Sequence, residues 1–412
     1  MPIKFRTIVT AIAISLIASI ARGENNIVHL WADSTLTNTV AVASRSNYVF
    51  IADRDLGMVA MAVYDTIPPQ FASLYDPGVP LFDIEVHGTY AYIASGINDP
   101  HTGWLLILDI ESPANPIFVG SLQSNLEYRR VAVGAYAYGL QTNTLKTINI
   151  NNPANPVEIG SVTVTNAIDL CTRGNYVYVA CQNYGLRIID ITIPESPQVV
   201  GTCDTPGIAS GISMRIADSS HVYIADGGAG IQIIDVSTPS EPIIVGNYQT
   251  AADAMSITGG KNYIYTTLSD SNVAVVMVGN PRYLKLVGST DIPHLPSGIA
   301  LYGANAVQGI VVTDRIMLDT YAIHRTPCVL HPGDMNNSGN VNGVDVSFGV
   351  IYFKGGPAPP YICSCWSHPN FAIDCDVNAS CQFNGVDITY LVAFLKGSVP
   401  ELLSCPDCPY EY

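Results

Sequence analysis

The stretch that decides the fold lies in the middle of the chain. It reads Tyr176-Val-Tyr-Val-Ala-Cys181, then Gly185-Leu-Arg-Ile-Ile-Asp190-Ile, then Pro194-Glu-Ser-Pro197 and Gln198-Val-Val-Gly201. Its first run alternates with a period of two, as a half-buried strand requires. The following unit, from His221 to Gly246, repeats the same order of residue types. A repeated four-part β unit is therefore the starting point for the fold.

The unit recurs through most of the chain, with anchors 40 to 46 residues apart. The anchor residues are Tyr48, Tyr90, Tyr136, Tyr176, His221 and Tyr263, and a degenerate seventh copy follows at residues 306–312. A period of about 40–45 residues with four strands per unit is typical of propeller blades. The seventh copy lacks its fourth strand, whereas residues 27–31 resemble one. We predict that this N-terminal strand completes the last blade and closes the ring.

The residue pattern of these units resembles that of the LVIVD repeat family of bacterial surface propellers. The resemblance covers residues 27 to 325 and is strongest in the fourth and fifth units. It implies a fold but no particular chemistry, because function depends on sites that are added to a fold.

Three aspartates, Asp109, Asp190 and Asp235, share one position of the repeat. They form either an acidic ring that binds metal or sugar, or caps of the turn after each strand, and turn chemistry favours the caps. We interpret the aromatic anchors as packing residues rather than a stacking platform. Cys171 and Cys181 lie on adjacent predicted strands, where a disulfide is one interpretation. No catalytic or cofactor-binding residue is assigned, because no hydrolase, zincin or P-loop motif occurs.

The N-terminus and the charge indicate an exported protein. Lys4 and Arg6 precede an apolar run, and Ala21-Arg22-Gly23 supplies small residues at a cleavage site, so residues 1–23 are predicted to be a signal peptide. We expect no membrane span after cleavage and a secreted or cell-surface location. The net charge of −16 argues against nucleic-acid binding. Export also allows disulfides among the ten cysteines.

The C-terminal segment, residues 328–412, contains the strongest motif. Oxygen-bearing side chains and a central Gly339 follow the spacing of a calcium loop from Asp334 to Asp345. The pattern returns from Asp376 to Asp387, and each loop precedes a short amphipathic run that ends in Lys-Gly. The fold class is therefore all-β, a seven-bladed β-propeller of four-stranded blades over residues 24–327. A small α-helical domain with two EF-hand-like calcium loops and a disulfide-rich tail follows it.

Two such loop-helix units resemble the dockerin domain over residues 330 to 398. The resemblance implies two Ca²⁺ sites and a cohesin-like or cell-surface partner. The ligands it implies are Asp334, Asn336, Ser338, Asn340, Asn342 and Asp345 in loop one, and Asp376, Asn378, Ser380, Gln382, Asn384 and Asp387 in loop two. The partner-binding positions it implies are Gly343, Val344, Gly385 and Val386.

Loop two departs from the pattern because Cys381 occupies the sharp turn where glycine is usual. Both loops also carry Ser rather than Asp at their fifth position, which lowers the ligand charge. The seven clustered cysteines favour disulfides over a zinc site. These cysteines are Cys328, Cys363, Cys365, Cys375, Cys381, Cys405 and Cys408.

Together these features indicate a secreted, non-catalytic binding or scaffolding protein. Its propeller presents a surface for a carbohydrate or protein ligand, and its C-terminal domain docks to a partner. The alternative is an extracellular carbohydrate-active enzyme, a lyase or hydrolase, with its site at the mouth of the propeller. Unlike, repeat-breaking polar residues near the axis would favour the enzyme, and a symmetric axis would favour the binding protein.

Overall fold

The computed structural model describes residues 27–323 and residues 392, 395 and 396; within the first range, residues 34, 65–66, 99–100, 217, 262, 281–282, 293, 304–308 and 315 are not described. The predicted signal peptide and both predicted calcium loops lie outside the described residues. Across the part of the chain that is described, no helix has the length and apolar character of a membrane span.

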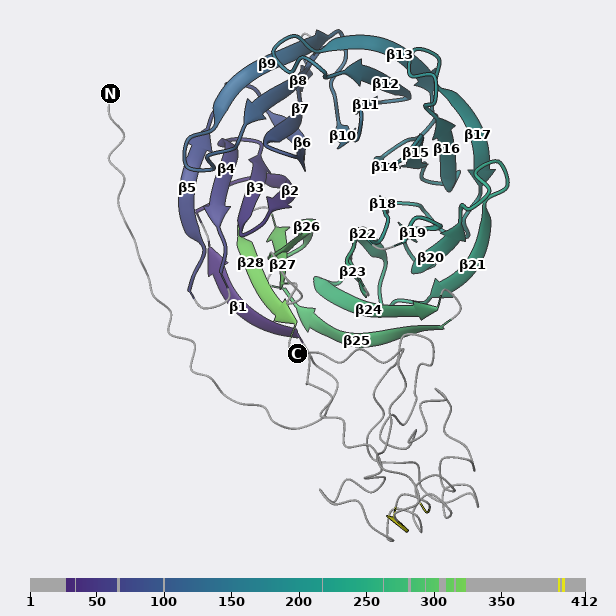
Figure 1. Ribbon diagram of the computed structural model, residues 1–412. Coiled ribbons are helices and arrows are strands. Elements are labelled where there is room, and N and C mark those ends of the chain that lie inside the picture. Colours follow the sequence, from purple (N-terminus) through teal and green to yellow (C-terminus); the bar gives the residue numbers. More distant parts are fainter. Residues whose placement is uncertain are drawn as a thin grey trace.

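Seven four-stranded antiparallel sheets surround one axis, as the repeat predicts (Figure 1). Blades 1 to 3 consist of β2 (Thr39–Arg45), β3 (Tyr48–Asp53), β4 (Gly57–Ala62) and β5 (Gln70–Tyr75); β6 (Leu81–His87), β7 (Tyr90–Asn98), β8 (His101–Asp109) and β9 (Ile117–Ser124); and β10 (Arg130–Val133), β11 (Ala137–Gln141), β12 (Thr144–Asn149) and β13 (Val157–Thr163).

The remaining blades follow the same order from the axis outward (Figure 1). Blades 4 to 6 consist of β14 (Asp169–Arg173), β15 (Tyr176–Ala180), β16 (Leu186–Asp190) and β17 (Gln198–Cys203); β18 (Gly211–Ser213), β19 (His221–Ala225), β20 (Ile231–Asp235) and β21 (Ile243–Tyr248); and β22 (Ala254–Gly259), β23 (Tyr263–Leu268), β24 (Asn272–Asn280) and β25 (Tyr283–Asp291).

Blade 7 joins the two ends of the propeller chain, which confirms the predicted closure. Its strands are β26 (Pro296–Tyr302), β27 (Gly309–Asp314), β28 (Leu318–Ile323) and β1 (Ile27–Asp33), and β1 pairs antiparallel with β28 from Ile27↔Ile323 to Asp33↔Leu318. The N-terminal strand therefore supplies the outer edge of the last blade. Because the ring is closed, every blade has a neighbouring blade on both of its faces.

The hydrophobic core is divided into seven clusters, one between each pair of neighbouring blades. The cluster between blades 1 and 2, for example, contains Phe50, Ala60, Ile93 and Leu108. The cluster between blades 7 and 1 joins Val49 and Val59 to Val311 and Leu318. A four-stranded blade has two apolar faces, so each face must pack against a neighbour.

The Gly and Pro positions of the repeat form a direct contact between blades. The glycine of an outer strand lies against the proline turn of the next blade, with no room for a side chain. A Cβ on Gly120, Gly160 or Gly201 would lie 2.4, 2.3 or 1.9 Å from the carbonyl oxygen of Pro153, Pro194 or Pro239, respectively. In blade 1 the equivalent Ser73 instead donates a hydrogen bond of 2.6 Å to the carbonyl of Pro113.

This contact makes Gly201 the strictest test of the packing. Gly201→Ala should destabilise the ring by about 1–3 kcal/mol, the usual cost of overpacking. The matched control is Gly134→Ala, because a Cβ there would approach no atom closer than 3.4 Å. Denaturant unfolding of both variants checks the prediction, and equal stability of the two would contradict it.

Candidate ligand site on the propeller axis

The inner strands define two faces of the ring. They begin on one face, here called the upper face, and end on the other, the lower face. The innermost strands β2, β6, β10, β14, β18, β22 and β26 surround the axis in Figure 1. Their side chains alternate, so residues two apart on one inner strand share a side.

Strand registers identify which inner-strand residues are equivalent among blades. The residues equivalent to Asp83, in the order of blades 1 to 7, are Ala41, Asp83, Arg130, Asp169, Gly211, Ser256 and Gly298. The residues equivalent to Glu85, in the same order, are Ala43, Glu85, Ala132, Cys171, Ser213, Thr258 and Ala300. Charged side chains are thus confined to three consecutive blades. We call Asp83, Glu85, Arg130, Asp169 and Cys171 the axial cluster.

Two carboxylates of the axial cluster bridge neighbouring inner strands. The amide of Val131 in β10 donates to Asp83 Oδ2 at 2.8 Å, and the amide of Ile212 in β18 donates to Asp169 Oδ2 at 2.9 Å. An inner strand is the edge of its sheet, so these amides have no strand partner on that side. Both aspartates therefore hold blades together and keep further oxygen lone pairs free.

Arg130 connects the two acidic strands across blade 3. Its Nε lies 3.7 Å from Asp169 Oδ1, and its Nη1 donates to the carbonyl of Phe82 in β6 at 3.4 Å. The Arg130 and Asp169 side chains are 37% and 27% exposed, so solvent still reaches this ion pair. The Arg130 guanidinium acts on Asp83 and Asp169, so the axial cluster, which also contains Glu85, carries an excess of negative charge when all three carboxyl groups are ionised.

Burial and mutual repulsion raise the pKa values of the carboxyl groups. Burial, with repulsion from Asp83 and Asp169, raises the pKa of Glu85 to about 8. Burial also raises the pKa of Asp83 to about 6, although Arg130 and the Val131 amide oppose the shift. Within the described part of the chain, no hydrogen bond reaches the carboxyl of Glu85. With these pKa values, Glu85 is largely protonated at neutral pH, whereas Asp83 is largely ionised.

Metal binding does not explain the cluster. Among the described residues, no three His, Cys, Asp or Glu side chains are placed so that they could hold one ion. Burial raises the pKa of the Cys171 thiol, and repulsion from Asp169 adds to the shift. A thiol that stays protonated is a poor nucleophile. The arrangement offers hydrogen-bond donors, acceptors and negative charge to a ligand.

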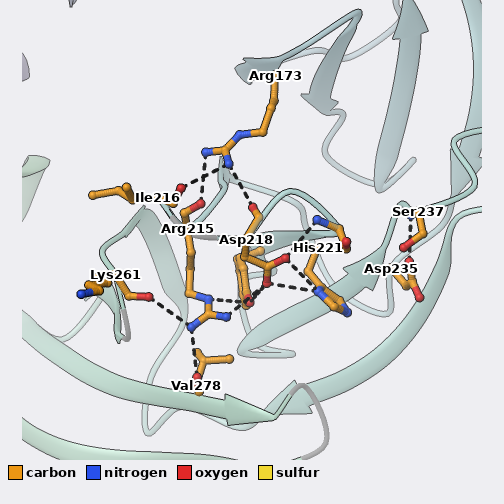
Figure 2. Close-up of polar contacts among 11 residues, drawn as sticks. Arg173, Arg215, Ile216, Asp218, His221, Asp235, Ser237, Lys261 and Val278 are labelled. Carbon is orange, nitrogen blue, oxygen red and sulfur yellow. Dashed lines mark hydrogen bonds and ion pairs between the residues drawn. The ribbon is translucent and has the colours of Figure 1, made fainter. Parts of the chain in front are cut away.

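The polar network on the lower face has a structural role. Figure 2 shows Arg173 donating to the backbone of blade 5, with Nη2 at 3.1 Å from the Arg215 carbonyl. Arg215 in turn donates to the carbonyls of Lys261 and Val278 in blade 6. Each arginine at the end of an inner strand thus ties its blade to the next. These contacts occupy several of the donors of each arginine.

Asp218 neutralises this network from within. It lies 3.2 Å from Arg215 Nη2 and 3.1 Å from His221 Nδ1, and it accepts a 2.9 Å hydrogen bond from the Tyr223 hydroxyl. Burial alone would raise the pKa of Asp218, but hydrogen bonds from Ser220, His221 and Tyr223 outweigh burial and lower it. The carboxylate therefore stays ionised and paired.

The repeated aspartates cap turns, as turn chemistry predicts. Asp109, Asp190 and Asp235 each accept a hydrogen bond of 2.8 Å from the amide two residues later. The hydrogen bond of Asp235 to Ser237 is drawn in Figure 2 and lowers the pKa of that aspartate. The acidic-ring interpretation is therefore not supported. The aromatic anchors of blades 1 to 4 and 6 pack against the interblade clusters, as predicted.

The disulfide interpretation for Cys171 and Cys181 is wrong. Both are free thiols, as is Cys203. Strand register explains this, because Cys171 lies opposite Tyr178 in β15, three residues before Cys181. Cys181 packs in the core between blades 3 and 4, whereas Cys171 packs against the cluster between blades 4 and 5. The two thiols therefore belong to different interfaces.

Comparison with known proteins identifies the repeat. The LVIVD repeat model matches residues 82–124, 129–164, 166–205 and 210–250, which correspond to blades 2 to 5. The protein is a β-propeller, and LVIVD repeats form blades of its seven-bladed ring. No curated protein matches the chain.

Solved structures support the fold alone. Sqt1 of Saccharomyces cerevisiae is 10% identical with a TM-score of 0.54, covering 73% of this chain and 100% of its own. A chain of the mitotic checkpoint complex is 12% identical with a TM-score of 0.55, covering 74% and 94%. The designed protein Ika8 is 11% identical with a TM-score of 0.51, covering 72% and 99%. Similarity at such low identity carries no function.

The raised pKa of Glu85 predicts a distinctive dependence of stability on pH. The folded protein holds this proton more tightly than the unfolded chain, whose Glu has a pKa of 4.5. The contribution of Glu85 to the free energy of unfolding therefore falls as pH rises from 4.5 to about 8. Since Gln cannot ionise, the stability of Glu85→Gln should exceed that of the wild type increasingly between pH 5 and pH 9.

Thermal unfolding of both proteins across that range measures the effect. The difference in Tm between Glu85→Gln and the wild type should widen by roughly 2–4 °C for each ~1 kcal/mol by which the free energies of unfolding of the two proteins differ. Glu241→Gln is the matched control, because Glu241 is exposed in a turn of blade 5. A constant gap between the Glu85→Gln and wild-type curves would contradict the assigned environment.

Proposed function

We propose that this protein is a secreted binding protein whose propeller holds its ligand at the axial cluster. The observation that carries the proposal is the confinement of charged axial residues to blades 2, 3 and 4, while the matched places elsewhere hold Ala, Gly, Ser or Thr. Packing of the ring does not require such residues, because four blades pack without them. Glu85, whose pKa is raised to about 8, together with the Arg130 guanidinium and the two aspartates, suits a carbohydrate or protein ligand.

Catalysis is the second candidate, and two observations favour it. The axial polar residues are unlike and break the repeat, which is the pattern that we expected of an enzyme. Glu85 and Asp83 lie two residues apart on the same strand with pKa values of about 8 and about 6. A protonated and an ionised carboxyl group in proximity are the acid and base that glycoside hydrolysis needs. The hydrogen bond from Val131 to Asp83 favours a structural role for that aspartate, so we place binding first.

One experiment separates these two functions. The full chain is run in affinity gels that contain soluble xylan, pectin or alginate, and the same mixtures are assayed for new reducing ends and unsaturated products. Retardation without product, lost in Glu85→Gln, supports carbohydrate binding. Product formation that disappears in Asp83→Asn and Glu85→Gln supports the enzyme. If the wild type neither binds nor cleaves, the carbohydrate class is wrong for this site.

The second part of the proposal is calcium-dependent docking by the C-terminal domain. It rests on the sequence of the two loops, Asp334–Asp345 and Asp376–Asp387, and on their resemblance to dockerins. Calcium would neutralise the repulsion between the first and last aspartates of each loop. A cohesin-like or cell-surface partner would then hold the propeller outside the cell.

Calcium titration of the full chain by calorimetry tests this part. We expect binding that Asp334→Ala reduces strongly and Asp376→Ala reduces less, because loop two has Cys381 where the calcium-loop pattern has glycine. Ligand binding stabilises the folded form by about 2.7 kcal/mol at 100-fold excess over Kd, so calcium should raise the melting temperature of the C-terminal transition. No heat at millimolar calcium would show that the loops are vestigial.

A further inference from the structure

Exposed apolar side chains lie on the upper face, next to the axis. Ile208 precedes β18 by three residues, Met255 is the second residue of β22, and Leu295 directly precedes β26. Their exposures are 54%, 46% and 62%. We call these residues the apolar arc. They belong to three consecutive blades, 5, 6 and 7, and none of them is part of an interblade core cluster.

The apolar arc and the axial cluster lie toward the same face of the ring. The arc belongs to blades 5 to 7, and the acidic residues belong to blades 2 and 4, where Asp83 and Asp169 lie near the start of their inner strands. Leu126, four residues before β10 in blade 3, adds a further apolar side chain that is 46% exposed. A ligand on the upper face therefore meets both apolar side chains and carboxyl groups.

We infer that the upper face binds a protein segment that places a Lys or Arg side chain at the axial cluster and apolar side chains on the apolar arc. The inference rests on the proposed binding function and selects a protein ligand over a carbohydrate. Charge complementarity carries it, since the axial cluster contains three carboxyl groups and one guanidinium. A cation would offset the burial and the repulsion from Asp83 and Asp169 that raise the pKa of Glu85, and the net charge of −16 would attract a basic partner.

The chemistry of the face argues for a peptide rather than a sugar. Isolated exposed apolar residues are common, but three on consecutive blades beside one polar site make a mixed surface. Burial of the exposed half of one such side chain contributes roughly three- to tenfold in affinity. Hydroxyl-rich ligands would gain little from the arc. A cationic segment with apolar flanks uses both kinds of side chain.

The test is an array of capped heptapeptides probed with the labelled full chain. The central residue is Lys, Arg, Glu or Ser, and the flanking residues are either drawn from Leu, Val, Ile and Phe or are all Ser. We expect signal only where a basic centre has apolar flanks. Met255→Ser and Leu295→Ser should each weaken it roughly three- to tenfold. Asp169→Asn should weaken it too, while its amide oxygen still accepts the hydrogen bond from Ile212.

Ile193→Ser is the matched control, because Ile193 is 63% exposed in the turn between β16 and β17, on the lower face, and should leave binding unchanged. Circular dichroism melting confirms that each variant folds. Equal signal on acidic centres, unchanged binding by the Met255 and Leu295 variants, or no signal at all would overturn the inference. So would sedimentation showing a dimer that Met255→Ser abolishes, because a second copy would then cover the arc. Retardation by a polysaccharide that needs Glu85 but not Met255 would overturn only the peptide ligand and leave the axial binding function standing.

Discussion

The packing of each blade face against the next blade is the interaction on which the rest of this structure depends. Every interblade cluster draws apolar side chains from two sheets, so no blade has a complete core of its own. The proline turn and outer-strand glycine fix the spacing at the rim, and the arginines at the ends of inner strands fix it on the lower face. A charged residue at the axis is tolerated because the faces carry the stability.

That division explains why the axis can vary while the blades stay alike. At the positions equivalent to Asp83 and Glu85, a side chain need only be small or hydrogen-bonded. In blades 1, 5, 6 and 7 the side chains at these positions are small. In blades 2 and 4, aspartates bind amides of the neighbouring inner strand and so satisfy an otherwise unpaired edge. Glu85 has no such contact, and its raised pKa records the energetic cost of keeping it there. This uncompensated carboxyl group is the feature on which the proposed ligand site depends.

The ring could be predicted from the sequence because the four-strand residue pattern of the blades recurs at a regular spacing. The spacing of the tyrosine anchors gave the number of blades, and the missing fourth strand of the last unit gave the closure by β1. The axial cluster was not predicted from the sequence, because Asp83, Arg130 and Asp169 belong to inner strands, and the inner strands have little sequence similarity among the repeat units. Aligning each unit backward from its anchor would have exposed them as unlike residues at one position. The free state of Cys171 could not be foreseen either, since it depends on a register offset of three residues from Cys181.

The shared last blade also sets an order of events during synthesis. The strand β1 emerges first, yet its partner β28 ends at Ile323, almost three hundred residues later. Blades 1 to 6 can stack in chain order, but the cluster that joins blade 7 to blade 1 must wait for the final strands. Until then the growing ring presents one open apolar face at each end. Closure of this protein is thus a single late step, and the nascent chain needs protection from aggregation until that step occurs.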